Sequence, residues 1–211
     1  MTMARASNCN WHTSLVFSFT QPTADAIKQQ LAAAVQLPAS LSCFLTLQLG
    51  LKTPRLPSGF AHDSSRSCIG HGERTFLRAR RAFEEWAPFD LGWVAVANPS
   101  APISTGQVVA VEAHTLGLWS LSLSRIVQVL DAPTSFGFLY STTPLHVEEG
   151  EERFLLTFDP ESGDVWYDLE AVSRPRHPLA RFGFPITRSF QHKFARESHR
   201  RMKEAVSSRL V

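Results

Sequence analysis

The stretch HVEEGEERFLLTFDPESGDVWYDLEAVSRPRHPLARFG, residues 146–183, decides the fold more than any other part of the sequence. Apolar and polar residues alternate on both sides of the turn segment 159–163, as they do in the two strands of an antiparallel β-hairpin. Four carboxylates stand within five residues of the first strand, at Glu148, Glu149, Glu151 and Glu152. Adjacent like charges are unfavourable on a strand unless water, a cation or a ligand receives them. The stretch therefore indicates an architecture and one wall of a binding site, but no substrate.

The length and composition of the chain favour one well-packed domain with an extension. The chain has 211 residues, of which 44% are hydrophobic and 19% are charged, a globular rather than a disordered composition. Residues 1–14 carry no periodic pattern and are predicted to be loose. Residues 15–211 are predicted to form the single domain, in which residues 15–60 make an N-terminal helical extension.

The net charge of +2 hides a strong segregation of charge along the chain. Nine of the 19 acidic residues lie between Glu148 and Glu170, and ten of the 21 Lys and Arg residues lie from Arg174 onward. Such segregation usually means that neighbouring elements neutralise each other in the fold. No RNA-binding motif or glycine-rich phosphate loop accompanies the basic residues, so we predict no nucleic-acid partner and no cofactor.

The cysteines and the hydropathy pattern bear on compartment and metal content. Cys9, Cys43 and Cys68 are odd in number and scattered, and we recognise no CxxC or Cys/His metal spacing among them, so a reducing compartment and no metal are predicted. No apolar run approaches the ~18 residues of a membrane span. The cytoplasm is the default compartment. The acid-poor segment before Asp25 allows organelle import, although Arg5 is its only basic residue.

Periodicity predicts helices first and strands afterwards. Helical spacing of apolar residues predicts helices over 20–37 and 72–86, with an extended Pro-rich loop over 52–61 between them. The period then changes to two, and a last helix follows Pro185 to about Ser207. Strands are predicted over six segments, which are 90–97, 106–116, 118–130, 134–142, 147–158 and 164–173.

The order of these elements predicts an α+β fold. A short strand and two helices precede six closely spaced strands, which favours an antiparallel meander over parallel βαβ units. The long C-terminal helix then has a curved sheet to pack against. This is the helix-grip arrangement, a curved antiparallel sheet wrapped around a long C-terminal helix, and the space between the two layers is a natural ligand cavity.

Several sequence segments together resemble one known family. They are LPSGF (56–60), GHGE (70–73), LGWV (91–94), HTLGLW (114–119), HVEEGEERFLLTFD (146–159), VWYD (165–168) and SRPRHPLARFGFP (173–185). They resemble an uncharacterised family of actinobacteria, plants and other eukaryotes that is grouped with the START/SRPBCC-type helix-grip proteins. The resemblance covers about residues 18–207. It implies the helix-grip fold and a ligand cavity, and it leaves the chemistry open because the wider fold includes carriers, cyclases, dehydratases and lyases.

Strand parity singles out Arg125 as a candidate ligand-binding residue. Within 118–130, Trp119 and other apolar residues share one face with Arg125, so this face is predicted to point into the interior or cavity. An unpaired charge there is unfavourable, and we predict an ion pair with Glu152 or Asp168. The pair is either structural, fixing the strand register, or an anchor for an anionic or carbonyl group of a ligand.

His146, Glu148 and Glu152 are the candidate catalytic residues. His146 precedes the acidic strand, and Glu148 lies two residues further on the same side, so the two are suited to act as an acid/base pair. The structural alternative is a solvated turn histidine. A metal site is a less favoured alternative, and none is assigned.

The remaining candidate ligand-binding residues are Tyr140, Tyr167, Asp168 and Arg174. Each tyrosine either packs in the core or presents its hydroxyl to a ligand. Arg174 belongs to the elbow that begins at Ser173. The basic groups of the elbow meet the acidic hairpin, and we favour a structural latch between strand and helix there, with a phosphate or carboxylate clamp as the alternative.

The combined prediction is a protein that binds a small, mainly apolar or aromatic molecule between the sheet and the last helix. One form of the hypothesis is a cofactor-independent cyclase, isomerase or dehydratase. The alternatives are a non-catalytic carrier or sensor of a lipid-like ligand, and an interaction protein without a cavity. The sequence does not predict an oligomeric state.

Overall fold

Antiparallel strands and three α-helices make up the part of the chain that this computed structural model describes, residues 17–39, 44–47, 56, 58–176 and 184–207. The helices are α1 (Ala24–Val35), α2 (Glu73–Glu84) and α4 (Phe184–Ser207), with a short 3-10 helix at Ala87–Phe89. The strands are β1 (Phe17–Ser18), β2 (Ala61–His71), β3 (Val94–Val96), β4 (Val108–Thr115), β5 (Leu118–Ala132), β6 (Ser135–Thr142), β7 (Glu148–Phe158) and β8 (Asp164–Pro175).

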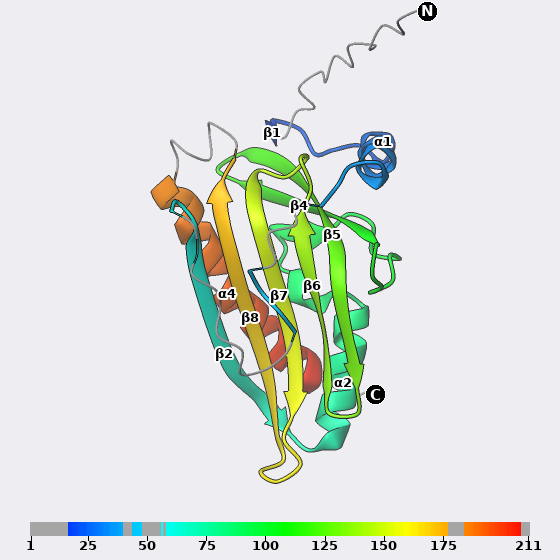
Figure 1. Cartoon of the computed structure of the whole chain (residues 1–211), viewed down its shortest axis with the longest axis vertical. Helices are drawn as coiled ribbons and strands as arrows, with labels where there is room; N and C mark the ends of the chain where they lie inside the picture. Colours follow the sequence, from blue (N-terminus) through cyan, green and yellow to red (C-terminus); the bar gives the residue numbers. More distant parts are fainter. Residues whose placement is uncertain (1–16, 40–43, 48–55, 57, 177–183, 208–211) are drawn as a thin grey trace, which may run out of the picture.

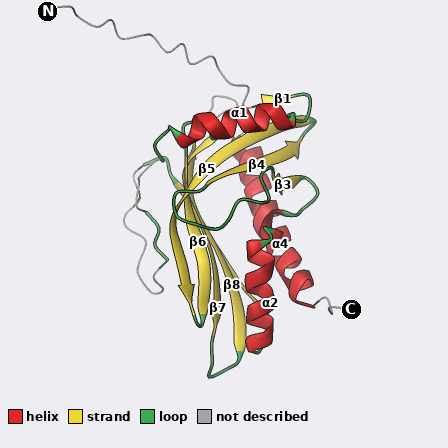
Figure 2. Cartoon of the chain, turned by 90° about the vertical axis from the view of Figure 1, so that its right-hand side faces the viewer, coloured by secondary structure: helices red, strands yellow, loops and turns green. Residues whose placement is uncertain are grey.

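The strands form one curved antiparallel sheet in the order β2-β8-β7-β6-β5-β4-β3, and β1 pairs with β5. From β3 to β8, each strand pairs with the next one in the chain, as the closely spaced strand predictions required. Helices α2 and α4 lie on one face of the sheet (Figures 1 and 2). Helix α1 lies across the end of the sheet near β1 and packs on the opposite face. The helix-grip prediction is therefore confirmed. Residues 1–14, predicted to be loose, lie outside the described residues.

Strand β2 is the main element that the periodicity missed. The sequence of Ala61–His71 is AHDSSRSCIGH, which has too few apolar residues to show a strand pattern. It pairs antiparallel with β8, from Ala61 opposite Ser173 to His71 opposite Asp164. Burial alternates along it because one face meets α4 and the other meets solvent. The sheet therefore begins with an edge strand that brings polar side chains to the terminal helix.

Three separate clusters of buried hydrophobic residues lie on the two faces of the sheet in the described part of the chain, and one of them joins Leu139 and Leu155 to Leu45 and Leu47. The largest fills the concave side between the strands, α2 and α4, where Phe83, Phe138 and Phe154 are fully buried. On the opposite face, α1 packs its apolar stripe onto Leu121 and Leu123 of β5. The buried apolar face of β5 that the sequence shows thus lies under α1 rather than in the cavity.

Glycines mark the places where neighbouring strands of the sheet approach most closely. A Cβ atom at Gly137 would lie 2.3 Å from the backbone oxygen of Phe154, and one at Gly150 would lie 2.0 Å from that of Val172. Real Cβ atoms do not tolerate such distances, so only glycine fits either position. Gly150 lies on β7 between Glu148 and Glu152, within the acidic stretch of the sequence.

The predicted ion pair of Arg125 with Glu152 or Asp168 is wrong. The Arg125 guanidinium donates instead to the carbonyl oxygens of Ala34, Val35 and Leu37, at 2.8, 3.1 and 3.0 Å, and to that of Gly106 at 2.9 Å. The last carbonyls of a helix have no intrahelical donor and carry a partial negative charge. Arg125 therefore caps α1 and fixes it to the outer face of the sheet.

Replacing Arg125 with methionine is expected to lower the free energy of unfolding by about 2 kcal/mol, because the carbonyl acceptors at the end of α1, two of them in part-buried hydrogen bonds, lose a charged donor. Chemical denaturation monitored by circular dichroism measures the change. The control is Arg66→Met, since the Arg66 side chain is 49% exposed and its change should stay within about 0.5 kcal/mol. Equal effects of the two substitutions would contradict the capping role.

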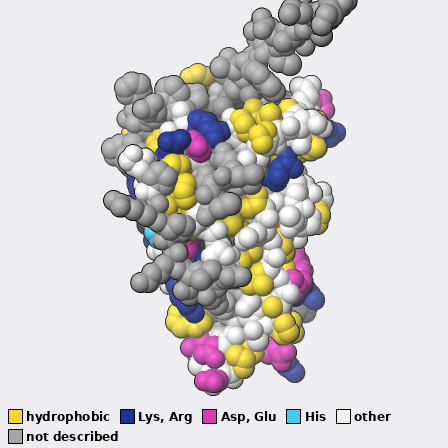
Figure 3. Space-filling model, in the orientation of Figure 1, with side chains coloured by type: hydrophobic (Ala, Val, Ile, Leu, Met, Phe, Trp, Pro, Cys, Tyr) yellow, Lys and Arg dark blue, Asp and Glu magenta, His cyan; other side chains and the backbone are white. Residues whose placement is uncertain are grey.

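The acidic hairpin and the basic elbow neutralise each other across the β7–β8 pair. Arg174 donates to the Glu149 carboxylate at 3.0 and 2.8 Å, so this arginine joins the two strands of the hairpin rather than a strand and the helix. Among the described residues of the face in Figure 3, basic and acidic side chains lie beside one another.

None of the helices in the described ranges has the length and apolar character that a membrane crossing requires.

Candidate functional site

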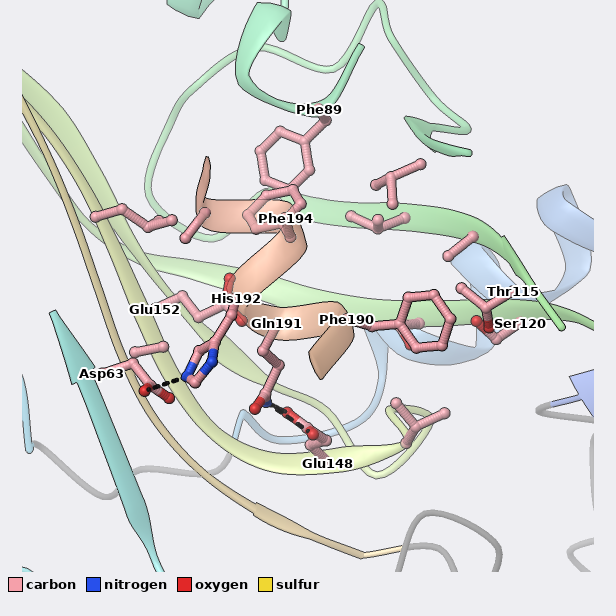
Figure 4. A pocket seen from close by; sticks show the side chains of 18 of the residues that line it. Asp63, Phe89, Thr115, Ser120, Glu148, Glu152, Phe190, Gln191, His192 and Phe194 are labelled. Atoms are coloured by element: carbon pink, nitrogen blue, oxygen red, sulfur yellow. Dashed lines mark hydrogen bonds and ion pairs between the residues drawn. The ribbon is translucent and has the colours of Figure 1, made fainter. Parts of the chain in front are cut away.

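A cavity of about 520 Å³ lies between the concave face of the sheet and α4 (Figure 4). Its apolar wall comes from the sheet, from the segment after α2 and from α4. The main apolar lining residues are Phe89, Trp93, Val94, Val111, Ala113, Leu169, Phe190 and Phe194. On β5 the cavity is lined by Ser120 and Ser122, whose face lies opposite that of Leu121 and Leu123. A mainly apolar cavity with a few convergent polar groups is the usual form of a small-molecule site.

Glu152 and Tyr140 form the central polar pair of the cavity. They lie opposite each other on β7 and β6, and the Tyr140 hydroxyl donates to Glu152 Oε2 at 2.6 Å. Burial raises the pKa of the Glu152 carboxyl to about 7, and the nearby Glu148 and Asp63 carboxylates add to the increase. A carboxyl group with this pKa exchanges protons near neutral pH, as a general acid or base must. Burial also raises the pKa of Tyr140 well above its usual value, so its hydroxyl remains a donor.

Glu148 lies nearer the start of β7 and is 6% exposed. Gln191 of α4 donates to both of its carboxylate oxygens, at 2.9 and 2.8 Å, and also to Ser173 Oγ at 3.2 Å. Burial raises the pKa of Glu148, while these hydrogen bonds oppose the increase. Glu148 thus connects the acidic strand to the terminal helix.

Asp63 of β2 and the start of α4 form the polar rim of the cavity. Arg188 donates through two nitrogens to the Asp63 carboxylate, and His192 Nε2 lies 3.3 Å from Asp63 Oδ1. Burial opposes ionisation of Asp63, but the hydrogen bond and charge of Arg188 hold the pKa of its carboxyl below the usual value. Asp63 is therefore ionised at neutral pH and already paired.

His146 also lines the cavity, but it is oriented differently from the prediction. Its Nδ1 accepts a hydrogen bond from the backbone N–H of Glu148 at 3.0 Å, and the Glu148 carboxylate is turned toward Gln191. Burial lowers the pKa of His146 to about 4, so the imidazole is neutral at pH 7. Nδ1 also lies 3.2 Å from the backbone oxygen of Glu148, so the Glu148 backbone contacts Nδ1 in either tautomer of the neutral ring.

The structure brings four of the nine predicted site residues together and places the other five elsewhere. His146, Glu148, Glu152 and Tyr140 line the cavity. Those outside its lining are Trp119, Arg125, Tyr167, Asp168 and Arg174. Most of these five residues were misplaced because strand parity alone does not show which face of the sheet borders the cavity. Both faces are buried in places, so an apolar stripe occurs on each.

The contacts of Arg125 and Arg174 are described above, and those of the other three residues account for their positions in the same way. Trp119 stacks on His114 with ring centroids 4.6 Å apart, and Asp168 lies 3.7 Å from Arg66. The buried Tyr167 hydroxyl lies 2.8 Å from Ser198 Oγ in the main core. Tyr167 therefore packs in the core, which was the structural alternative for this residue.

Most polar cavity residues that the sequence reasoning missed come from β2 and α4. Those on β2 and α4 are Asp63, Ser64, Ser65, Gln191, His192, Arg196 and His199, and Thr115, Ser120 and Ser122 line the cavity from β4 and β5. The β2 residues were missed together with their strand. Gln191 carried no signal, because one amide on a helix has no characteristic spacing. His192 and His199 lie two turns apart on one face of α4, and helical spacing alone does not distinguish a face toward a cavity from one toward solvent.

A possible set of metal ligands lies away from the cavity, at the β2–β8 pair. Donor atoms of Cys68, His71 and Asp164 lie within 4.8 Å of one another, and His71 Nδ1 is 2.9 Å from Asp164 Oδ1. The register shift after Cys68 creates this grouping. The side chain of His71 is 73% exposed, and its ion pair with Asp164 already accounts for both groups. None of the three lines the cavity.

These features define a helix-grip protein whose cavity combines apolar walls with a titratable carboxyl–phenol pair. The chain belongs to the family described as a domain of unknown function, DUF1990, whose model matches residues 46–201. A UPF0548 protein of Dictyostelium discoideum is 35% identical over 162 residues, covering 72% of this chain and 75% of its own. A UPF0548 protein of Deinococcus radiodurans is 34% identical over 167 residues, covering 72% and 81%. The family resemblance of the sequence segments is confirmed.

Solved structures with a similar arrangement share little sequence with the chain. The Zhui aromatase/cyclase from Streptomyces sp. R1128 matches with a TM-score of 0.49 and 12% identity, covering 72% of this chain and 96% of that one. The structure of Ara h 8.0201 matches with a TM-score of 0.47 and 15% identity, covering 72% and 100%.

Proposed function

We propose that the cavity binds a small, mainly apolar molecule and that Glu152, held by Tyr140, transfers a proton to or from it. The observation that carries the proposal is the position of a carboxyl group with a pKa of about 7 in an otherwise apolar wall. Such a group is half ionised near neutral pH and accepts or returns a proton without a cofactor. Cyclisation, isomerisation and dehydration all require such a transfer.

The division of roles within the site follows from its hydrogen bonds. Tyr140 occupies Oε2 of Glu152, which leaves Oε1 as the oxygen that meets the ligand. Gln191 holds both oxygens of Glu148, so Glu148 shapes the electric field and is not the first proton acceptor. His146 is a neutral imidazole, which has one N–H donor and one acceptor nitrogen.

A generic proton-transfer probe tests the role of Glu152 without knowledge of the natural substrate. The probe is 5-nitrobenzisoxazole, a neutral aromatic molecule that opens when a base removes its carbon-bound proton. The proton passes to the Glu152 carboxylate, the N–O bond breaks, and a coloured cyanonitrophenolate forms. We expect catalysis that increases through about pH 7, as Glu152 ionises, and that falls roughly 100-fold in Glu152→Gln.

The matched control for this experiment is Glu149→Gln, because Glu149 lies on the same strand and points to the opposite face toward Arg174. It should retain the activity. Equal activity in the Glu152 variant would remove Glu152 from the proposal.

A non-catalytic carrier is the second candidate function, and the predominance of apolar residues in the lining favours it. The two candidates differ in one measurement. A carrier holds a ligand after purification from its source, as native mass spectrometry detects, and shows no activity toward the probe that depends on Glu152. The cavity itself argues against the third alternative, an interaction protein with an occluded core.

A further inference from the structure

The cavity is lined by more negative than positive groups. Among the described residues that line it, three carry carboxyl groups and one carries a guanidinium. The carboxyl groups belong to Asp63, Glu148 and Glu152, and the guanidinium belongs to Arg196, on the exposed side of α4. The histidine next to the acidic strand, His146, adds no charge at neutral pH, since burial lowers its pKa to about 4.

Arg188, the other arginine near the cavity, is already engaged. Arg188 is bound to Asp63 through two nitrogens, and His192 contacts the same carboxylate. Glu148 is held by the neutral amide of Gln191, and Glu152 by the neutral hydroxyl of Tyr140. Neither glutamate forms a salt bridge with a described residue. Two cavity carboxyl groups on one strand are therefore hydrogen-bonded but not neutralised.

This arrangement determines which ligand charge the cavity accepts. An anionic ligand would add a further like charge to a poorly solvated space, which is unfavourable. A cation would relieve the repulsion between Glu148 and Glu152 and replace the water that each carboxylate has lost. The rings of Phe89, Phe190 and Phe194 add a favourable surface for a cation and for an apolar body. Figure 4 shows both glutamates projecting from the sheet toward α4.

We infer that the ligand of this cavity is an amine, with an apolar or aromatic body against the phenylalanines and a protonated nitrogen received by Glu152 at Oε1, while Glu148 adds negative charge to the same wall. The inference rests on the proposed small-molecule function of the cavity and specifies the class of ligand. It also reverses the sequence-based expectation that an arginine anchors an anionic group. Arg125, the residue chosen for that role, caps α1 on the other face of the sheet.

Three probes of the same shape test the inference by isothermal titration calorimetry on the full chain. They are 2-(2-naphthyl)ethylamine, 2-(2-naphthyl)ethanol and 3-(2-naphthyl)propionate, which are cationic, neutral and anionic near pH 8. We expect the amine to bind about tenfold or more tightly than the alcohol, and the propionate to bind least. In the double variant with Glu148→Gln and Glu152→Gln, the amine should lose this advantage while the alcohol still binds, which shows that the cavity is intact.

The Glu149→Gln variant is the matched control, and it should keep the preference for the amine. If the alcohol or the propionate binds the wild-type protein as tightly as the amine, the amine inference is overturned and the cavity function stands. If none of the three probes binds at millimolar concentration, both the inference and the proposed cavity function fail. Retention of the preference in the double variant would likewise overturn the assignment to these two carboxylates.

Discussion

Replacing Gly150 with alanine is expected to prevent stable folding. The added Cβ would lie 2.0 Å from the backbone oxygen of Val172 and 2.7 Å from the Cα of Ser173, both on the paired strand β8. Backbone atoms cannot move aside as the end of a flexible side chain can, so β7 and β8 would have to separate. We expect a loss of about 4 kcal/mol or more in the free energy of unfolding, a large part of the stability of a typical domain.

Thermal and chemical denaturation followed by circular dichroism measure this loss, and Gly163→Ala is the matched control. Gly163 lies in the turn that follows β7, and nothing would stand within 4 Å of an added Cβ there. Its φ of +78° still makes alanine unfavourable, by about 1 kcal/mol. A Gly150 variant that is no less stable than this control would show that the two strands do not approach as closely as described.

Replacing Glu152 with glutamine is expected to stabilise the protein near pH 8 and to leave its stability near pH 4 almost unchanged. The pKa of the Glu152 carboxyl is about 7 in the folded protein, and its usual value, expected in the unfolded chain, is 4.5. Below the lower value, the group is protonated in both the folded and the unfolded state. Between the two values, the unfolded chain loses the proton first, so the wild-type protein loses stability as the pH rises, by up to about 3 kcal/mol above pH 7.

The measurement is the difference in the free energy of unfolding between wild type and variant at several pH values. Using the difference removes the contributions of groups that do not interact with Glu152, while the effect of the Glu148 and Asp63 charges on the Glu152 carboxyl is part of the measured difference. A difference that does not change from about pH 4 to pH 8 would mean that Glu152 titrates normally. A gain in stability together with the loss of probe activity is the pattern expected when a group is kept for function.

The sequence was sufficient to predict the architecture, because strand and helix periodicity are local properties. The helix at Ala24–Val35, the helix at Glu73–Glu84 and the strands from Val94 onward lie within or close to the predicted ranges. Strand β2 could not be predicted in this way. Its stability comes from the ladder with β8 and from α4, which are distant in sequence, rather than from an apolar pattern of its own.

The candidate site was only half predictable, for a related reason. Parity showed that Glu148 and Glu152 share a face with Phe154, and this face does border the cavity. On β5 the same reasoning failed, because the apolar face is covered by α1 while the serine face borders the cavity. Parity assigns residues to two faces but does not tell which layer covers each face. That information lies in the partner elements.

The arrangement of β5 has a consequence for how proteins of this architecture can diversify. In the first part of the strand, the large side chains of Leu121 and Leu123 are on the side away from the cavity and the inner side carries the small Ser120 and Ser122, whereas Ile126 further along packs into the concave core. Exchanging either serine for a larger or smaller residue changes the shape of the ligand space and leaves the outer packing intact. Ligand preference and stability can thus be selected independently along one strand, at alternate residues.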